Sequence, residues 1–298
     1  MDRIVIKVNS VCNLACEYCF YKEKEQRMLQ RKRQSREKVN YFLESIEKNA
    51  SIKSVVITGG EPTLYPNIEK LLKCFTNKNV TILTNGVRRL KGCNLDNVRM
   101  VISLDGDYKI MRKQRNILME DFDKIIHNVI YYIKKSQHVD ISTLVTEFNL
   151  KEREYYPFKK FGIECSYSFN VPSKIFTPYA FLISNEEYSK VLEWILSIEE
   201  KNDFRLNASV GIIPTSYVKK NLEQVIDEIY IVEYDMEKNN FSVFNYAYTN
   251  LDDLIKDERI IKGRLQKILQ NKIEHYNCEY INPYNEIEEY IYKRSVKG

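Results

Sequence analysis

The sequence has 298 residues, which is long for one ordinary domain but normal for a single α/β barrel with an appendage. Hydrophobic residues make up 44% of it, enough for a large core, and no window is apolar enough to predict a membrane span. The net charge of +5, from 46 basic and 41 acidic side chains, is too mild to indicate nucleic-acid binding. The N-terminus lacks a signal-peptide pattern, so we expect a cytoplasmic protein with no membrane or nucleic-acid partner.

Strand-like and helix-like segments alternate along the first 171 residues. Short apolar runs predict strands at residues 4–8, 54–58, 80–84, 99–104, 139–146 and 164–171. Helical periodicity predicts helices at residues 34–49, 67–76 and 122–135, with a further helical stretch near 151–160. This alternation is typical of an α/β fold with parallel strands. We therefore expect a partial (β/α)6 TIM-type barrel.

The C-terminal part follows a different pattern. Residues 230–258 indicate a hairpin followed by a helix, without a further strand–helix alternation. We divide the chain into a barrel core, residues 1–180, and a smaller α+β C-terminal extension, residues 181–298. The extension is expected to bind or cap the substrate.

Small and polar residues follow each expected strand. The first strand leads into C-x3-C-x2-C, the second into T-G-G-E-P, the third into T-N-G and the fourth into S-L-D-G. The fifth and sixth strands end near residues 143–146 and 168–170 in the same kind of residue. Because barrel enzymes carry their functional groups after the C-terminal ends of the strands, this pattern predicts a rim around a ligand.

Three cysteines, Cys12, Cys16 and Cys19, fall within eight residues. In a reducing cytoplasm such spacing favours metal binding over disulfides. Three thiolates can hold three irons of a four-iron cluster and leave the fourth iron open, as a catalytic site requires. A structural zinc site with a fourth ligand from elsewhere is the alternative, although no second C-x2-C pair is present.

The following rims supply groups for an organic ligand. Gly59 and Gly60 would let the backbone approach it closely, Glu61 would offer an acceptor to an ammonium group, and Pro62 would fix the exit of the turn. Further contacts are expected from the next strand ends and from the cysteine loop. Asn85 could reach the same ligand, Ser103 and Asp105 could bind ribose hydroxyls, and Tyr18 could pack on an aromatic base or in the core.

The motifs C-N-L-A-C-E-Y-C, G-G-E-P-T-L, T-N-G and S-L-D-G, in this order, resemble the radical S-adenosylmethionine (SAM) superfamily over residues 4–171. The resemblance implies one [4Fe-4S] cluster on Cys12, Cys16 and Cys19, with SAM on the open iron. The G-G-E-P segment would hold the SAM amino group, and Ser103 and Asp105 would contact the ribose. One electron would cleave SAM to methionine and a 5′-deoxyadenosyl radical, which abstracts a substrate hydrogen.

The S-L-D-G motif resembles the branch that modifies peptides and proteins, whose SPASM extension binds auxiliary clusters through several cysteines. Here only Cys278 follows residue 165, so the extension is read as a degenerate, cluster-free one. Cys278 is either a half-buried thiol or, as in peptide epimerases of the superfamily, a catalytic hydrogen donor. Cys165 has the same two interpretations.

The resulting prediction is an enzyme that modifies a ribosomally made peptide or a protein by a cross-link, a thioether or an epimerisation. Its partners would be that peptide and an electron donor such as flavodoxin or ferredoxin. The basic run at residues 27–36 would be a candidate substrate contact. Two alternatives remain: the same chemistry on a nucleoside, sugar or cofactor precursor, and a non-catalytic iron–sulfur or zinc protein that binds partners or senses redox state.

Overall fold

The computed structural model describes most of the barrel and much of the C-terminal part. The longer described segments are residues 2–19, 36–92, 95–135, 138–150, 166–170, 204–206, 213–244 and 246–275. Residues 187, 190, 280–281, 283–284, 286–287 and 290–291 complete the description. None of the described helices is both long and apolar enough to cross a membrane.

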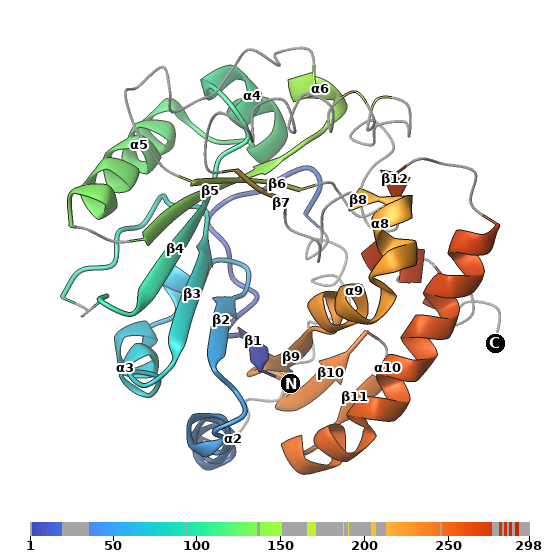
Figure 1. Ribbon diagram of the computed structural model, residues 1–298. Coiled ribbons are helices and arrows are strands. Elements are labelled where there is room, and N and C mark those ends of the chain that lie inside the picture. Colours follow the sequence, from blue (N-terminus) through green and yellow to red (C-terminus); the bar gives the residue numbers. More distant parts are fainter. Residues whose placement is uncertain are drawn as a thin grey trace.

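A ten-stranded, largely parallel sheet organises the molecule (Figure 1). The strands that match the predicted ones are β1 (Arg3–Lys7), β2 (Ser54–Thr58), β3 (Asn79–Thr84), β4 (Val98–Ser103), β5 (His138–Leu144) and β6 (Ser166–Asn170). These six pair in sequence order and in parallel. The sheet has β7 (Phe204–Leu206) at one edge and β11 (Tyr246–Tyr248) at the other, so it does not close. The predicted partial barrel is confirmed.

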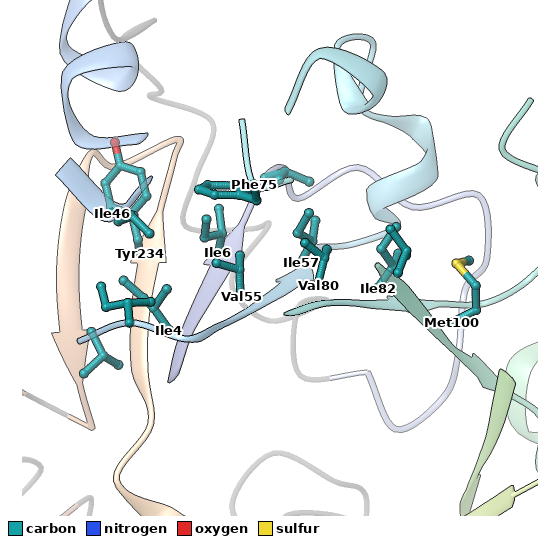
Figure 2. Packing of buried hydrophobic residues seen from close by; sticks show 14 of the residues in the cluster. Ile4, Ile6, Ile46, Val55, Ile57, Phe75, Val80, Ile82, Met100 and Tyr234 are labelled. Atoms are coloured by element: carbon teal, nitrogen blue, oxygen red, sulfur yellow. The ribbon is translucent and has the colours of Figure 1, made fainter. Parts of the chain in front are cut away.

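The strands are buried on one face and partly open on the other. Ile4, Ile6, Val55, Ile57 and Ile82 are fully buried because they point toward the helices. Figure 2 shows this row of side chains meeting Phe75, which lies just beyond α3 (Ile68–Lys73). The alternating positions on β2 and β4 keep part of their surface exposed. We call the second side of the sheet its inward face, since it is the face turned away from these helices.

Helices cover the outside of the curved sheet. Figure 1 shows α2 (Arg36–Lys48), α3 and α5 (Met119–Lys134) there. Between β4 and α5 lies α4 (Tyr108–Arg115), a helix that the sequence pattern did not predict. The shorter helical segments are the 3-10 turn η1 (Pro62–Leu64) and α6 (Glu147–Leu150). The helical stretch expected near residues 151–160 lies outside the described residues.

The C-terminal part continues the same sheet. After α8 (Thr215–Lys220) and α9 (Leu222–Ile229), β9 (Val232–Asp235) pairs in parallel with β1. It then forms an antiparallel hairpin with β10 (Asn240–Val243), which pairs with β11. The long helix α10 (Leu251–Glu274) packs against α9, and β8 (Ile213–Pro214) pairs with β12 (Tyr280–Ile281). Thus the hairpin expected from the sequence is present, and it lies beside β1.

Candidate active site

The loop that carries the three cysteines follows β1 and lies on the loop after β2. The Val8 N–H donates to Thr58 O (2.9 Å), the Gly60 N–H to Asn9 O (2.9 Å) and the Glu61 N–H to Val11 O (2.8 Å). These backbone hydrogen bonds extend the pairing of β1 and β2 beyond the ends of both strands. They fix the start of the cysteine loop before Cys12.

The two glycines are required by this loop-to-loop contact. A Cβ atom on Gly59 would lie 2.6 Å from Asn9 O, and one on Gly60 would lie 2.5 Å from Val11 O. Either distance is far below van der Waals contact, so the chain can pass here only without a side chain. In the structure the glycines make room for the cysteine loop, and the close approach of their backbone to a ligand stays a prediction.

The Glu61 carboxylate also serves the protein. It is buried and accepts hydrogen bonds from Thr63 N (3.0 Å), Thr63 Oγ1 (2.6 Å), Thr84 Oγ1 (2.7 Å) and Asn85 N (2.7 Å). Three of these donors bond to Oε1 and one to Oε2, so Oε2 can accept a further hydrogen bond, and the contact expected with an ammonium group stays a prediction. The carboxylate therefore joins the loops after β2 and β3, and Pro62 begins η1 directly behind it.

Asp105 is held in a similar network, at the end of β4. Its carboxylate receives a bidentate pair from Arg115 (2.7 and 2.8 Å) and accepts from Tyr18 Oη (2.7 Å) and Leu144 N (2.9 Å). Asp105 and Arg115 are both buried. These contacts leave the Asp105 carboxylate bound to protein groups, in place of the ribose contact expected for it.

Tyr18 is the link between this network and the cysteine loop. Burial raises the pKa of its phenol well above the usual range, although the nearby Arg115 guanidinium opposes this, so the hydroxyl is a hydrogen-bond donor. The Arg115 guanidinium lies 5.5 Å from the Tyr18 ring centroid, and the Glu17 N–H donates to Gln114 O (2.9 Å). Helix α4 is therefore the second element, after the loop that follows β2, that holds the cysteine loop in place. The signal for Arg115 in the sequence was the basic run that ends α4, ten residues after Asp105.

Two more of the residues expected to contact the ligand, Asn85 and Ser103, lie on the rim, and the Asn85 amide oxygen already accepts from Val87 N (3.0 Å). Asn85 donates to Asn13 Oδ1 (2.8 Å) and lies 3.8 Å from Cys12 Sγ, at the edge of the cysteine loop. Ser103 is half-buried on the inward face of β4 and is in register with Ser142 of β5. Asn170 on β6 donates to Ser142 Oγ (2.7 Å). Polar groups from three neighbouring strands therefore line this side of the rim.

The C-terminal hairpin contacts the cysteine loop from the opposite side, which the sequence pattern did not indicate. Lys7 Nζ lies 3.0 Å from Asp235 Oδ2, and both side chains are buried. The Met236 N–H donates to Lys7 O (2.9 Å), and the Ser10 N–H and hydroxyl both donate to the Glu237 carboxylate. The turn after β9 thus holds the backbone two residues before Cys12.

The three cysteines are free thiols that a bound metal group could hold as thiolates. All three are free and partly buried, and their thiols lie close enough to affect one another electrostatically. Burial raises the pKa of the Cys16 thiol to about 11 and also raises that of Cys12, so a cationic partner is needed to hold them as thiolates at neutral pH.

The remaining candidates cannot be placed. Cys278 and Cys165 lie outside the described residues, as does the basic run at residues 27–35. The possible hydrogen donor therefore stays a prediction.

Comparisons with known proteins agree with this geometry. The family model of the radical SAM superfamily matches residues 6–156. Among curated proteins, the mitochondrial GTP 3′,8-cyclase of Arabidopsis thaliana is 29% identical over 137 residues, and the 7-carboxy-7-deazaguanine synthase of Clostridium acetobutylicum is 26% identical over 155. The matches cover 41% and 48% of this chain, and 34% and 65% of those two proteins. The chain thus spans less than two thirds of either relative.

Solved structures with the same fold include two that contain SAM. Streptococcus suis SuiB bound to S-adenosylmethionine has a TM-score of 0.67 at 16% identity, covering 95% of this chain and 71% of SuiB. Native anSMEcpe with bound AdoMet has a TM-score of 0.64 at 18% identity, covering 100% of this chain and 98% of anSMEcpe. The family model matches residues 6–156, just over half of the 298 residues. This chain therefore belongs to the radical SAM superfamily.

Proposed function

We propose that this protein reductively cleaves SAM and abstracts a hydrogen atom from a peptide or protein substrate. The observation that carries the proposal is the cysteine loop. It is held by the loop after β2, by Asp105 and by Glu237, while its three thiols form no disulfide with one another. Three thiols are one fewer than the four that a purely structural cluster takes, and the one other cysteine in the described part of the chain, Cys74, lies at the end of α3. An incomplete set is what a cluster with an exchangeable ligand requires.

Each group of the site has a distinct task under this proposal. Cys12, Cys16 and Cys19 would hold one [4Fe-4S] cluster, which when bound to SAM supplies one electron for cleavage to methionine and a 5′-deoxyadenosyl radical. Ser103, half-buried on the inward face, and Asn85, which lies beside Cys12, are the side chains on the rim that we propose as contacts of SAM. Glu61, Asp105 and Tyr18 act through the loops they connect, since their polar atoms already bond to protein. They are positioning residues.

A peptide substrate is supported by the kind of protein that shares the fold over most of the chain. One structure is SuiB bound to its precursor peptide SuiA, with a TM-score of 0.59, and another is anSMEcpe with AdoMet and the Cp18Cys peptide, with a TM-score of 0.62. The inward face of this chain offers half-exposed polar positions along several strands, and the sheet has open edges at β7 and β11. Extended peptides bind well to such edges.

A small-molecule substrate is the second candidate, because both curated relatives carry names of enzymes that form small heterocycles. Their matches cover less than half of this chain, however. The residues matched by the superfamily model, 6–156, contain the four motifs that are expected to bind the cluster and SAM. The similarity is therefore weaker support for a substrate than for the shared cofactors.

Anaerobic reconstitution with iron and sulfide tests the proposal. With dithionite and SAM, the wild-type protein should release 5′-deoxyadenosine, measured by liquid chromatography and mass spectrometry, and Cys16→Ala should release none. Iron and sulfide are quantified in parallel. A fully loaded wild-type protein that forms no 5′-deoxyadenosine would contradict the proposal. A peptide substrate further predicts that a short reading frame beside the gene encodes a peptide that accelerates cleavage, and that free nucleosides do not.

A further inference from the structure

We propose that the exposed face of α4 is the docking surface for a small, acidic one-electron carrier protein that reduces the cluster. This inference rests on the proposed function, because only a reductive cleavage needs such a carrier. The α4 face consists of Lys109, Arg112 and Lys113, together with Leu118 and Met119 just after the helix. All five side chains are exposed.

The position of α4 makes it suitable for electron delivery. The last turn of the helix contacts the cysteine loop directly, through the hydrogen bond from Glu17 N to Gln114 O (2.9 Å). In the same turn, Arg115 pairs with Asp105, which also accepts from Tyr18 between Cys16 and Cys19. A partner on the outer face of α4 would therefore approach the cluster through one layer of protein. The inward face of the sheet would stay open for the substrate.

Part of the charge on the α4 face has a local role, since Lys113 Nζ lies 3.6 Å from the Phe148 ring centroid, but Lys109 has none that the helix explains. Arg112 and Lys113 lie in the last turn, where cations stabilise the helix dipole. Lys109 lies in the first turn, where a cation is unfavourable, so its presence needs another reason. Two neighbouring carboxylates are already engaged, since Asp107 caps the helix by accepting from Ile110 N (3.1 Å) and Asp121 pairs with Lys124 (2.8 Å), while Glu120 is exposed beside Met119.

The composition of the face matches a transient protein interface. Leu118 and Met119, three and four residues after the last residue of α4, are 67% and 49% exposed and would provide apolar contact. Interfaces of this kind use apolar residues for affinity, and charges for fast, salt-dependent association. Since the α4 face is basic, the complementary partner is acidic. Its task is limited to one electron: the carrier is oxidised by one electron and the cluster is reduced by one, with no proton transferred at the interface.

Charge reversal on α4 tests the inference. The variant Lys109→Glu/Arg112→Glu/Lys113→Glu is compared with Lys256→Glu/Arg259→Glu/Lys267→Glu, which makes the same change at exposed positions of α10, a helix on another side of the molecule (Figure 1). Release of 5′-deoxyadenosine is measured with dithionite, and separately with a flavodoxin kept reduced by NADPH and its reductase. The single variant Lys109→Glu is included because a carboxylate in the first turn favours the helix.

We expect the α4 variant to lose about tenfold or more of its rate with flavodoxin, while the α10 variant and all dithionite rates stay unchanged. The wild-type rate with flavodoxin should also fall as salt rises, since screening weakens the attraction. Equal flavodoxin rates in all variants would overturn the inference. The inference would also be overturned if the α4 variant differed from the wild type only in a weaker acceleration by the substrate peptide, measured with dithionite. That result would show that the α4 face binds the substrate. If even the wild type is inactive with dithionite, it is the proposed function that fails.

Discussion

At the scale of single residues, the contact between Gly60 and Val11 leads to a direct prediction. The Cβ atom of Gly60→Ala would lie 2.5 Å from Val11 O, so the cysteine loop must shift away from the rim. We expect the purified variant to bind much less iron and sulfide on reconstitution, with little change in its far-UV circular dichroism. Gly263→Ala is the matched control, because nothing lies within 4 Å of its Cβ position in α10. That substitution should stabilise the helix by about 1 kcal/mol. Normal cluster content in Gly60→Ala would show that the loop tolerates the shift.

The hydroxyl of Tyr18 permits a second prediction at this scale. Tyr18→Phe removes one hydrogen bond to Asp105 (2.7 Å) but leaves the bidentate pair with Arg115 intact. We therefore expect the free energy of unfolding of the cluster-free protein to fall by only about 1 kcal/mol. Urea denaturation followed by circular dichroism measures this change. An unchanged stability together with a raised KM for SAM would instead place the hydroxyl against the cofactor.

At the scale of elements, the turn between β9 and β10 is expected to depend on its buried ion pair. Asp235→Asn would leave the Lys7 ammonium buried without its carboxylate, and breaking such a pair costs about 3–5 kcal/mol. The double variant Lys7→Met/Asp235→Asn removes both charges and keeps a side-chain oxygen for the Glu237 and Lys238 N–H groups, so it should recover most of this loss. Urea unfolding of the wild type, both single variants and the double variant gives the coupling energy. Additive effects would mean that the two side chains do not stabilise each other.

The elements also show what the sequence could predict. The order of the motifs was sufficient to bring Cys12, Gly60, Asn85 and Ser103 to one rim, because consecutive parallel strands place their C-terminal ends together. The roles of Glu61 and Asp105 could not be read in the same way. Carboxylates at strand ends look alike in sequence whether they face a ligand or a protein donor. Here the partners are Thr84, Arg115 and the Leu144 N–H, and only the folded chain brings these groups to the carboxylates.

The contact of the C-terminal hairpin with the cysteine loop was missed for a related reason. Lys7 and Asp235 are 228 positions apart, and neither belongs to a motif. The hairpin itself was evident from its alternating pattern, but a pattern of this kind does not indicate which strand it will join. Pairing of β9 with the open edge of β1 decided the position of Glu237 beside Ser10.

At the scale of the whole molecule, the continuous sheet predicts that the C-terminal part cannot be removed. A chain ending at residue 229 would expose the edge of β1, where β9 pairs in parallel. It would also lose the aromatic cluster in which Phe42 of α2 contacts Tyr234 (5.4 Å between ring centroids) and Phe241 (5.4 Å). Lys7 would lose Asp235 as its buried partner. An unpaired edge next to exposed apolar surface favours aggregation.

We therefore expect the chain of residues 1–229 to be insoluble or to lack a cooperative unfolding transition. Co-expression with a second fragment, residues 230–298, is the control, because association of the fragments would restore β9 to β1 and recover soluble protein. Size-exclusion chromatography and thermal unfolding followed by circular dichroism distinguish these outcomes. If residues 1–229 alone form a monomer that unfolds cooperatively and still binds iron and sulfide, the C-terminal part is an independent unit. The contacts of Asp235 and Glu237 with the cysteine loop would then be dispensable for holding the cluster.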